Sequence, residues 1–477
     1  MTEEQSDSLR IRGGSPLRGD VRLGPDRAIL ETTLAVAALA CGRSELYGVS
    51  PSPGVPLTAA GSGAGDQLQR ATTNPQLEVA LAAWAQLGVQ CHMVGDQISV
   101  ESPGLDALQA PKGAIECGAS PRLLAQLSGV VAGNCFGTQL RAAGCADTPV
   151  GHWVEVLRAR GAHIAARGGA EAARLFPPVS VAPLLDSERL LALDASLPFC
   201  DAVGKDALLL NALYAAGATV LSEAHVSSDH LERALVQVGL PLRRIGSVVS
   251  LDIPAWSREL PGLGRVEIPG SAAQAGVLAA LVQTLPGSDV TLRGVSLNPS
   301  QSGVLDLLRS WGGALTVNPL GDAALREPVA DLRIRHAAVR GGVVDGDLLL
   351  RCGEAAPVLW LLGAHSRRGV RLCDLNVLRA QQRDPGWTSL DALCATLGVN
   401  VERAPEEVFV PHSELSSKTR VRAWDCQGDS ETALIACALA LATPGETVVE
   451  HALRALTALY PGFIRAAQEL GASIEHV

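Results

Sequence analysis

The stretch YPGFIRAAQELGA, residues 460–472, decides the fold of this chain, because its glycine-ended helix recurs along the 477 residues. Apolar residues at helical spacing in FIRAAQELG (463–471) predict an amphipathic helix, and the final glycine suits a helix end in the left-handed region. The same ending closes an amphipathic stretch at six positions: Gly88, Gly161, Gly239, Gly312, Gly398 and Gly471. Successive glycines lie roughly 75 residues apart, which predicts one supersecondary unit repeated six times.

A second helix in each unit is apolar on nearly every side. The pattern predicts these helices within 28–42, 121–133, 205–217, 272–287, 355–369 and 430–445, each ending at a glycine. Helices of this composition belong inside a bundle, covered by sheets and by the amphipathic helices. Six buried helices therefore predict two cores of three helices. Short alternating strands, such as VQCHMVGDQISV (89–100), supply the sheets.

The composition favours two compact domains and no membrane segment. Hydrophobic residues make up 47% of the chain and charged residues 18%, which is enough for two cores at this length. The longest apolar run, ALIACALALA (433–442), is about half of what a bilayer requires. The opening MTEEQSDS is acidic and polar, unlike a signal peptide, so we expect a cytoplasmic protein. Because the repeats fill both cores within one chain, we also expect a monomer.

Charge and motifs exclude several functions. The net charge of −10 argues against nucleic acid and anionic membranes as partners. The eleven cysteines include no CxxC pair, so neither a disulfide framework nor a metal site is expected. The sequence contains no phosphate loop, nucleophile elbow or HExxH motif. Ser227, Ser228, Asp229 and His230 resemble a nucleophile, an acid and a base in a row, but at a helix start Ser228 or Asp229 is better interpreted as an N-cap.

Four segments carry a resemblance to a known family: SSDHLER (227–233), LNPSQSG (297–303), EPVADLRI (327–334) and YPGFIRAAQELGA (460–472). With the six units, they make the chain from Leu9 to Val477 resemble the enolpyruvyl transferase family, and within it the 5-enolpyruvylshikimate-3-phosphate synthases. The resemblance implies an α/β fold, namely a two-domain inverse α/β barrel (prism) of six repeated βαβαββ units. We expect residues 21–245 to form the first domain, and residues 1–20 together with 246–477 to form the second.

The resemblance also implies a reaction of aromatic amino-acid biosynthesis. In that family the carboxyvinyl group of phosphoenolpyruvate passes to a hydroxyl of shikimate 3-phosphate, phosphate is released, and no metal or cofactor takes part. Two multiply charged anions must lie side by side, so the site needs a clamp of Lys and Arg side chains. It also needs an acid and a base for the tetrahedral intermediate.

The first domain departs from the family's pattern at most of these positions. The motif PGDKSISHR reads GPDRAILET here, so Arg27 keeps a cation while Thr32 replaces an arginine. Thr148 stands where the family's RPM segment has its arginine. In the ASAQVKS segment Asp201 replaces a serine, although Lys205 keeps the lysine. A carboxylate at the Asp201 position would repel a phosphorylated ligand.

The second domain departs as strongly. The loop NPTRTG reads NPSQSG, with Gln301 in place of the arginine. The motif ELRVKESDR reads DLNVLRAQQ (374–382), so that Asp374 is the carboxylate that remains. Arg379 lies within this motif, and Arg383 is displaced from it by one position. Almost the whole anion clamp is therefore missing from the sequence.

The remaining site residues follow from the resemblance. Glu354 is the carboxylate nearest to the family's aspartate base, and the alternative is an acid at a helix start, favoured by the macrodipole. AGCA around Cys145 partly matches the cysteine loop of a sister family, but a buried cysteine explains it better. The expected catalytic residues are Glu354 and Asp374, and the expected substrate-binding residues are Arg27, Asp201, Lys205, Ser227, Arg379 and Arg383.

Three functions stay open. Losing one cation from a desolvated phosphate site costs about 2 to 5 kcal/mol, so the substitutions favour a non-catalytic relative that binds a protein partner or a different small ligand. The second is an active transferase with a changed acceptor, whose small anionic substrate would be held by Arg27, Lys205, Arg379 and Arg383. The third is the ordinary synthase reaction. Fold alone does not decide among them.

Overall fold

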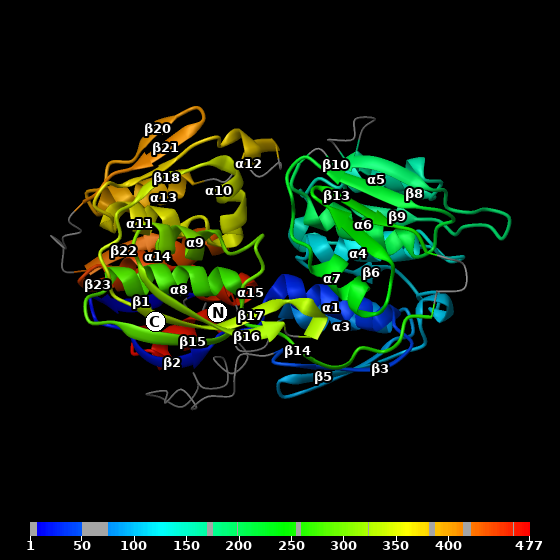
Figure 1. Ribbon diagram of the computed structural model, residues 1–477, viewed down its shortest axis with the longest axis horizontal. Helices are drawn as coiled ribbons and strands as arrows, with labels where there is room; N and C mark the ends of the chain where they lie inside the picture. Colours follow the sequence, from blue (N-terminus) through cyan, green and yellow to red (C-terminus); the bar gives the residue numbers. More distant parts are fainter. Residues whose placement is uncertain are drawn as a thin grey trace, which may run out of the picture.

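The computed structural model describes residues 7–49, 75–168, 175–197, 199–253, 259–322, 324–380, 387–413, 421–460 and 462–477. Two lobes lie side by side in it (Figure 1). One is built from the N-terminal half of the chain, drawn mainly in blue to green, and the other mainly from the C-terminal half, drawn in yellow to red. None of the described helices is both long and apolar enough to cross a membrane.

Within the described residues, six four-stranded sheets surround the two cores. Three belong to the first half, and their strands are given in spatial order. The first sheet consists of β14 (Gly264–Glu267), β3 (Gly42–Tyr47), β5 (Gln97–Ser102) and β4 (Gln90–Val94), and the second of β6 (Ile115–Glu116), β7 (Thr138–Arg141), β9 (Leu175–Val181) and β8 (Ile164–Gly168). The third consists of β10 (Leu193–Leu197), β11 (Thr219–Glu223), β13 (Val248–Leu251) and β12 (Leu242–Ile245). The other three belong to the second half. The fourth sheet consists of β16 (Ala314–Asp322), β17 (Pro328–Arg335), β15 (Asp289–Ser296) and β2 (Arg18–Arg22), and the fifth of β18 (Gly342–Val344), β19 (Val370–Leu372), β21 (Glu407–Val410) and β20 (Glu402–Ala404). The sixth consists of β22 (Val421–Asp425), β23 (Gly445–Glu450), β1 (Leu9–Gly13) and β24 (Ser473–His476).

Every sheet has the same pairing, one parallel pair followed by two antiparallel pairs. In the sheet of β10 to β13, for example, β10 runs parallel to β11, and β13 is antiparallel to both β11 and β12. A parallel pair needs a crossover helix, whereas an antiparallel pair can be joined by a tight turn. The shared pairing therefore confirms the predicted βαβαββ unit and its sixfold repetition.

The helices fall into the two classes that the sequence predicts. The buried ones are α1 (Arg27–Leu39), α4 (Pro121–Val131), α6 (Ala202–Ala212), α8 (Ala272–Thr284), α11 (Val358–His365) and α14 (Ser430–Ala442). The outer ones that end at the recurring glycines are α3 (Pro75–Ala85), α5 (Gly151–Ala159), α7 (His230–Gln237), α9 (Gly303–Ser310), α13 (Thr388–Thr396) and α16 (Phe463–Glu469). Three more short α-helices occur in the described part of the chain: α10 (Gly346–Cys352), α12 (Asn376–Ala380) and α15 (Leu453–Leu459).

The recurring glycines behave as predicted. All six, from Gly88 to Gly471, have a positive φ between 80° and 107°. This conformation ends a helix and strains any residue that carries a Cβ. The outer helices therefore stop at the same point of each unit.

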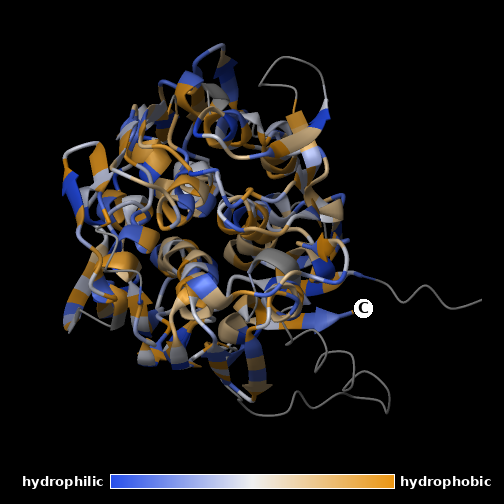
Figure 2. Cartoon of the chain, turned by 90° about the vertical axis from the view of Figure 1, so that its right-hand side faces the viewer, coloured by the Kyte–Doolittle hydropathy of each residue, from blue (hydrophilic) through white to orange (hydrophobic). Residues whose placement is uncertain are grey.

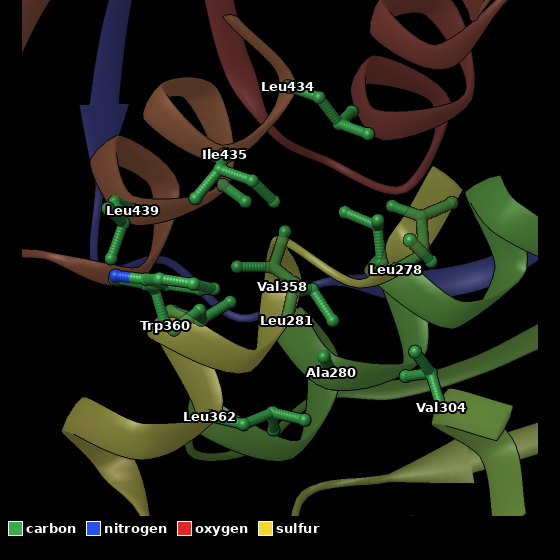
Figure 3. Packing of buried hydrophobic residues seen from close by; sticks show 14 of the residues in the cluster. Leu278, Ala280, Leu281, Val304, Val358, Trp360, Leu362, Leu434, Ile435 and Leu439 are labelled. Carbon is green, nitrogen blue, oxygen red and sulfur yellow. The ribbon is translucent and has the colours of Figure 1, made fainter. Parts of the chain in front are cut away.

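Orange, apolar helices occupy the interior in Figure 2, while the strands around them alternate between blue and orange. In the second half, α8, α11 and α14 pack against one another. Figure 3 shows Leu281, Val358 and Ile435 meeting between these helices, and Trp360 lying against Leu439. All five side chains are almost completely buried, and each such burial contributes roughly 1.5 to 3 kcal/mol.

The described apolar residues form two separate cores. The first contains residues from Ile29 to Ile268 and Leu325, and the second contains Leu9 to Leu23 together with most apolar residues from Ala275 onwards. The buried residues Val249, Leu251, Leu260, Val266 and Ile268, expected in the second domain, thus pack with the first core. The reason is that β13 pairs with β11 and β12, and β14 pairs with β3.

The chain crosses between the halves twice, and the two crossings are bonded to each other. Pro25 and Gly270 form an antiparallel bridge. The N–H of Asp26 donates to the carbonyl of Pro269 at 2.8 Å, and the N–H of Ser271 donates to the carbonyl of Gly24 at 3.0 Å. The first half is thus an insertion between two paired segments, and Arg27 and Ala28, directly after the first of these segments, line the cleft described next.

Candidate ligand-binding cleft

A cleft of about 470 Å³ lies between the two halves. The first half lines it with Arg27, Ala28, Pro121, Arg122, Asp147, Thr148, Pro149, His152, Trp153, Phe199, Cys200, Asp201, Ala202, Val203, Ser227 and Ser228. The second half lines it with Ser300, Gln301, Leu350, Gly353 and Glu354. Thr148 and Gln301, which the resemblance aligns with arginines of the family, are thus both at the cleft.

Three buried helices, α1, α4 and α6, begin at this cleft. Helix N-termini carry a partial positive charge and bind anions readily. Here the chain caps them itself, with Asp26 accepting from the N–H of Ile29, Ser120 from that of Leu123 and Asp201 from that of Gly204. The Asp201 bond measures 2.8 Å, and the carboxylate places a full negative charge at the start of α6.

Both described arginines that line the cleft are paired with carboxylates. Nη2 of Arg27 lies 3.5 Å from Oε1 of Glu354, across the two halves. Nη1 of Arg122 forms an ion pair with Oδ2 of Asp206 on α6, and only 1% of the aspartate side chain is exposed. Burial lowers the pKa of each arginine, but the neighbouring carboxylates more than offset this, so both pKa values are raised and both guanidinium groups stay charged.

His152 and Asp201 form a second feature of the wall. Nε2 of the histidine lies 2.8 Å from Oδ2 of the aspartate, and the two side chains are 14% and 7% exposed. The rings of Trp153 and Phe199 stand edge-on to the imidazole, with centroids 4.6 Å and 5.0 Å away. One side of the cleft is therefore aromatic and carries a carboxylate.

Lys205 does not line the cleft, although the sequence predicts it there. Its side chain is completely buried, and Nζ lies 3.2 Å from Oε1 of Glu223 and 2.6 Å from Oε1 of Glu232. Arg244 bonds the same two glutamates at 2.7 Å and 2.9 Å. Ser227 is tied to this network as well, since its N–H and hydroxyl both donate to Glu223. The network holds Ser227 at the edge of the cleft and leaves its hydroxyl committed to a carboxylate.

A buried polar cluster joins the halves beside the cleft. Nδ1 of His230 on α7 lies 2.7 Å from Oε1 of Glu327, and Nδ2 of Asn298 donates to Glu327 at 3.1 Å and to Asp229 at 2.7 Å. Burial lowers the pKa of His230, but the hydrogen bond and charge of Glu327 more than offset this and raise it. Asp229 is at the N-cap position, as predicted, yet its side chain makes no capping bond and binds Arg233 and Asn298 instead.

The other expected site residues lie as follows. Glu354 is at the cleft, as expected, and belongs to the turn between α10 and α11. Asp374 is exposed, has a left-handed φ of 58° and is not among the residues that line the cleft. Arg379 lies in α12, and Arg383 lies outside the described residues.

Arg122, His152, Trp153 and Phe199 line the cleft without having been predicted. The sequence contained a signal for Arg122, because this residue directly follows Pro121 at a helix start. A cation is unfavourable there, since it opposes the helix macrodipole, unless another interaction compensates for it. His152 meets Asp201 and Phe199 only through the fold, because both are far away in sequence, so no local pattern marks this wall of the cleft.

The cleft can therefore offer carboxylates, an imidazole and aromatic rings to a ligand, while its described arginines are already neutralised. Within the described residues, no three His, Cys, Asp or Glu side chains come together as a metal site.

Known proteins with similar sequences agree with the observed fold. A family model described as EPSP synthase (3-phosphoshikimate 1-carboxyvinyltransferase) matches residues 76–466. Proteins named 3-phosphoshikimate 1-carboxyvinyltransferase are similar over nearly the whole chain: that of Solibacter usitatus is 28% identical, covering 93% of this chain and 95% of its own, and that of Acidithiobacillus ferrooxidans is 29% identical, covering 98% of each.

Two solved structures have the same fold. EPSP synthase from Acinetobacter baumannii superposes with a TM-score of 0.80 at 22% identity, covering 98% of this chain and 99% of its own. The enolpyruvyl transferase NikO from Streptomyces tendae superposes with a TM-score of 0.68 at 17% identity, covering 98% of each chain.

Proposed function

The chain belongs to the EPSP synthase family, and on this premise we propose that it no longer performs carboxyvinyl transfer and instead binds a different small ligand in its cleft. One observation carries the proposal: both described arginines of the cleft are engaged by carboxylates of the chain itself, Arg27 by Glu354 and Arg122 by Asp206. The family's substrates are phosphorylated anions, and they would have to displace these carboxylates.

The substitutions around the pairs support the same conclusion. Thr148 and Gln301 line the cleft in place of two arginines, and Asp201 adds a carboxylate beside them. Each missing cation costs a desolvated phosphate about 2 to 5 kcal/mol, which corresponds to a loss in affinity of roughly 30-fold or more. A repelling carboxylate adds to this loss.

An active transferase with shikimate 3-phosphate or a changed acceptor is the second candidate. It is favoured by the presence of Arg27, Arg122 and Glu354 at one cleft. In this candidate function the ligand replaces Glu354 as the partner of Arg27, and the released carboxylate acts as the base.

Titration calorimetry with phosphoenolpyruvate and shikimate 3-phosphate, added separately and together, tests the proposal when combined with a phosphate-release assay. EPSP synthase from Acinetobacter baumannii is the matched positive control. We expect the control to bind and release phosphate, and the present chain to give neither binding heat at millimolar ligand nor phosphate. Micromolar binding with phosphate release would overturn the proposal and establish the second candidate.

Three further expectations stay predictions of the sequence. A protein partner is an alternative occupant for a non-catalytic relative, and the monomeric state and the cytoplasmic location can be checked by size-exclusion chromatography and by cell fractionation. Neither the ligand proposal nor its test depends on them.

A further inference from the structure

The cleft has a charge balance opposite to that needed for phosphorylated ligands. Three carboxylates of the described lining, Asp147, Asp201 and Glu354, face two arginines. Arg122 is neutralised by Asp206 from behind the wall, and Arg27 by Glu354 from the opposite half. After these pairings, negative charge remains in the cleft.

Asp201 is the strongest source of that charge. Its side chain is only 7% exposed, and one oxygen, Oδ1, accepts the capping bond from Gly204. None of the described donors is aligned for a hydrogen bond to the other oxygen, Oδ2, although Nε2 of His152 lies close to it. A buried carboxylate oxygen in this situation stabilises a cation or a strong donor placed nearby.

Aromatic rings stand beside the carboxylate. Phe199 lines the cleft beside His152, and Trp153, only 1% exposed, packs against the same imidazole from within the wall. The face of an aromatic ring attracts ammonium and guanidinium groups, and more so when water is excluded. Carboxylate and aromatic faces together select a cationic organic group over a neutral or anionic one.

We propose that the Asp201 side of the cleft binds an organic cation, an amine or guanidine attached to a ring. This inference rests on the proposed loss of phosphate binding and names the ligand class that replaces it. The ring packs against Phe199, and the cation lies close to Asp201. Asp147 and Glu354 extend the negative field across the cleft.

Titration of the full chain with three probes of one shape tests the proposal: benzylamine, which is cationic at pH 7, benzyl alcohol, which is neutral, and phenyl phosphate, which is anionic. We expect benzylamine to bind about tenfold more tightly than benzyl alcohol at low salt, and phenyl phosphate to bind least. The preference for benzylamine should shrink in 0.5 M NaCl, because salt screens charge. Equal binding of the first two probes, or tighter binding of phenyl phosphate, would overturn the proposal.

The variant Asp201→Asn tests whether Asp201 forms the proposed cation-binding site. Asparagine is an equally good N-cap, so α6 keeps its start while the charge is lost. We expect the preference for benzylamine to fall below about twofold in this variant. Asp96→Asn, in the exposed turn between β4 and β5, removes the same charge elsewhere and should keep the tenfold preference. An unchanged preference in Asp201→Asn would refute the role of Asp201.

The phosphate-release assay separates this inference from the function on which it rests. Phosphate release from the family's substrates overturns the proposed function whatever the probes do. No phosphate release together with no preference for benzylamine overturns the ligand class alone.

Discussion

Arg27 and Glu354 face each other across the cleft, with 3.5 Å between Nη2 and Oε1, so that one half of the molecule supplies the cation and the other half neutralises it. Glu354→Gln removes the charge with little change in shape and leaves Arg27 without its carboxylate. We expect phosphoenolpyruvate to bind at least about tenfold more tightly to this variant than to the parent, as measured by calorimetry. Glu402→Gln in exposed β20 is the control and should change nothing; an equal gain in both variants would mean that net charge, and not Arg27, governs the effect.

Lys205 is the centre of a completely buried ion-pair network. Lys205→Met preserves the volume but leaves Glu223 and Glu232 with Arg244 as their remaining cation. We expect a loss of about 3 to 5 kcal/mol in the free energy of unfolding, because an uncompensated buried charge is costly. Arg12→Met, which breaks the exposed pair with Glu446, should cost less than about 1 kcal/mol. Urea denaturation of both variants decides the matter, and similar losses would contradict the network's role.

His230 makes the stability depend on pH. Its pKa is raised above 6.5, since the hydrogen bond and charge of Glu327 and the charge of Asp26 outweigh the opposing effects of burial and of Arg122. The folded state therefore favours the protonated ring, and this contribution is complete below about pH 6.5 and is lost as the pH rises through the folded pKa. We expect the urea midpoint of the parent to fall between pH 6 and pH 9 more steeply than that of His230→Gln. His92→Gln, at an exposed position, should keep the slope of the parent, and a parent slope equal to that of His230→Gln would refute the assignment.

Gly129 lets α4 and α6 approach closely. A Cβ at this position would lie 2.1 Å from the carbonyl oxygen of Ala207, a backbone atom that cannot move alone. Gly129→Ala should destabilise the protein by about 1 to 3 kcal/mol despite the better helix propensity of alanine. Gly113→Ala meets nothing within 4 Å and should stay within about 0.5 kcal/mol of the parent in thermal or urea unfolding. A neutral Gly129→Ala would mean that the two helices can separate without cost.

The fold could be predicted because its information is local and repeated. Each unit carries a helix that ends at a glycine such as Gly88 or Gly471, and each of these glycines has the positive φ that the sequence implies. The boundary of the first core was harder to predict, because Val266 joins it through the pairing of β14 with β3, which depends on residues far away in the chain.

The cleft could be predicted only in part, for the same reason. Arg27, Asp201, Ser227 and Glu354 were placed there through their motifs, and all four line it. Lys205 was expected beside them, but its neighbours Glu223 and Glu232 draw the ammonium group into the interior. Such long-range pairs leave no periodic signal in the sequence.

The pairing of β1 with β23 and β24 has a consequence for how the protein is made. The ribosome releases Leu9 to Gly13 early, yet the strands that flank them on both sides, Gly445–Glu450 and Ser473–His476, are synthesised only after the whole first half. All residues of the first core except Leu325 have been synthesised once Ile268 has emerged, so most of this lobe can fold while translation continues. The second half must wait with two strands, β1 and β2, already synthesised and their partners still unmade. We therefore expect the inserted lobe to assemble first, and the sheet of β22, β23, β1 and β24 to close only after Ser473–His476 have been synthesised.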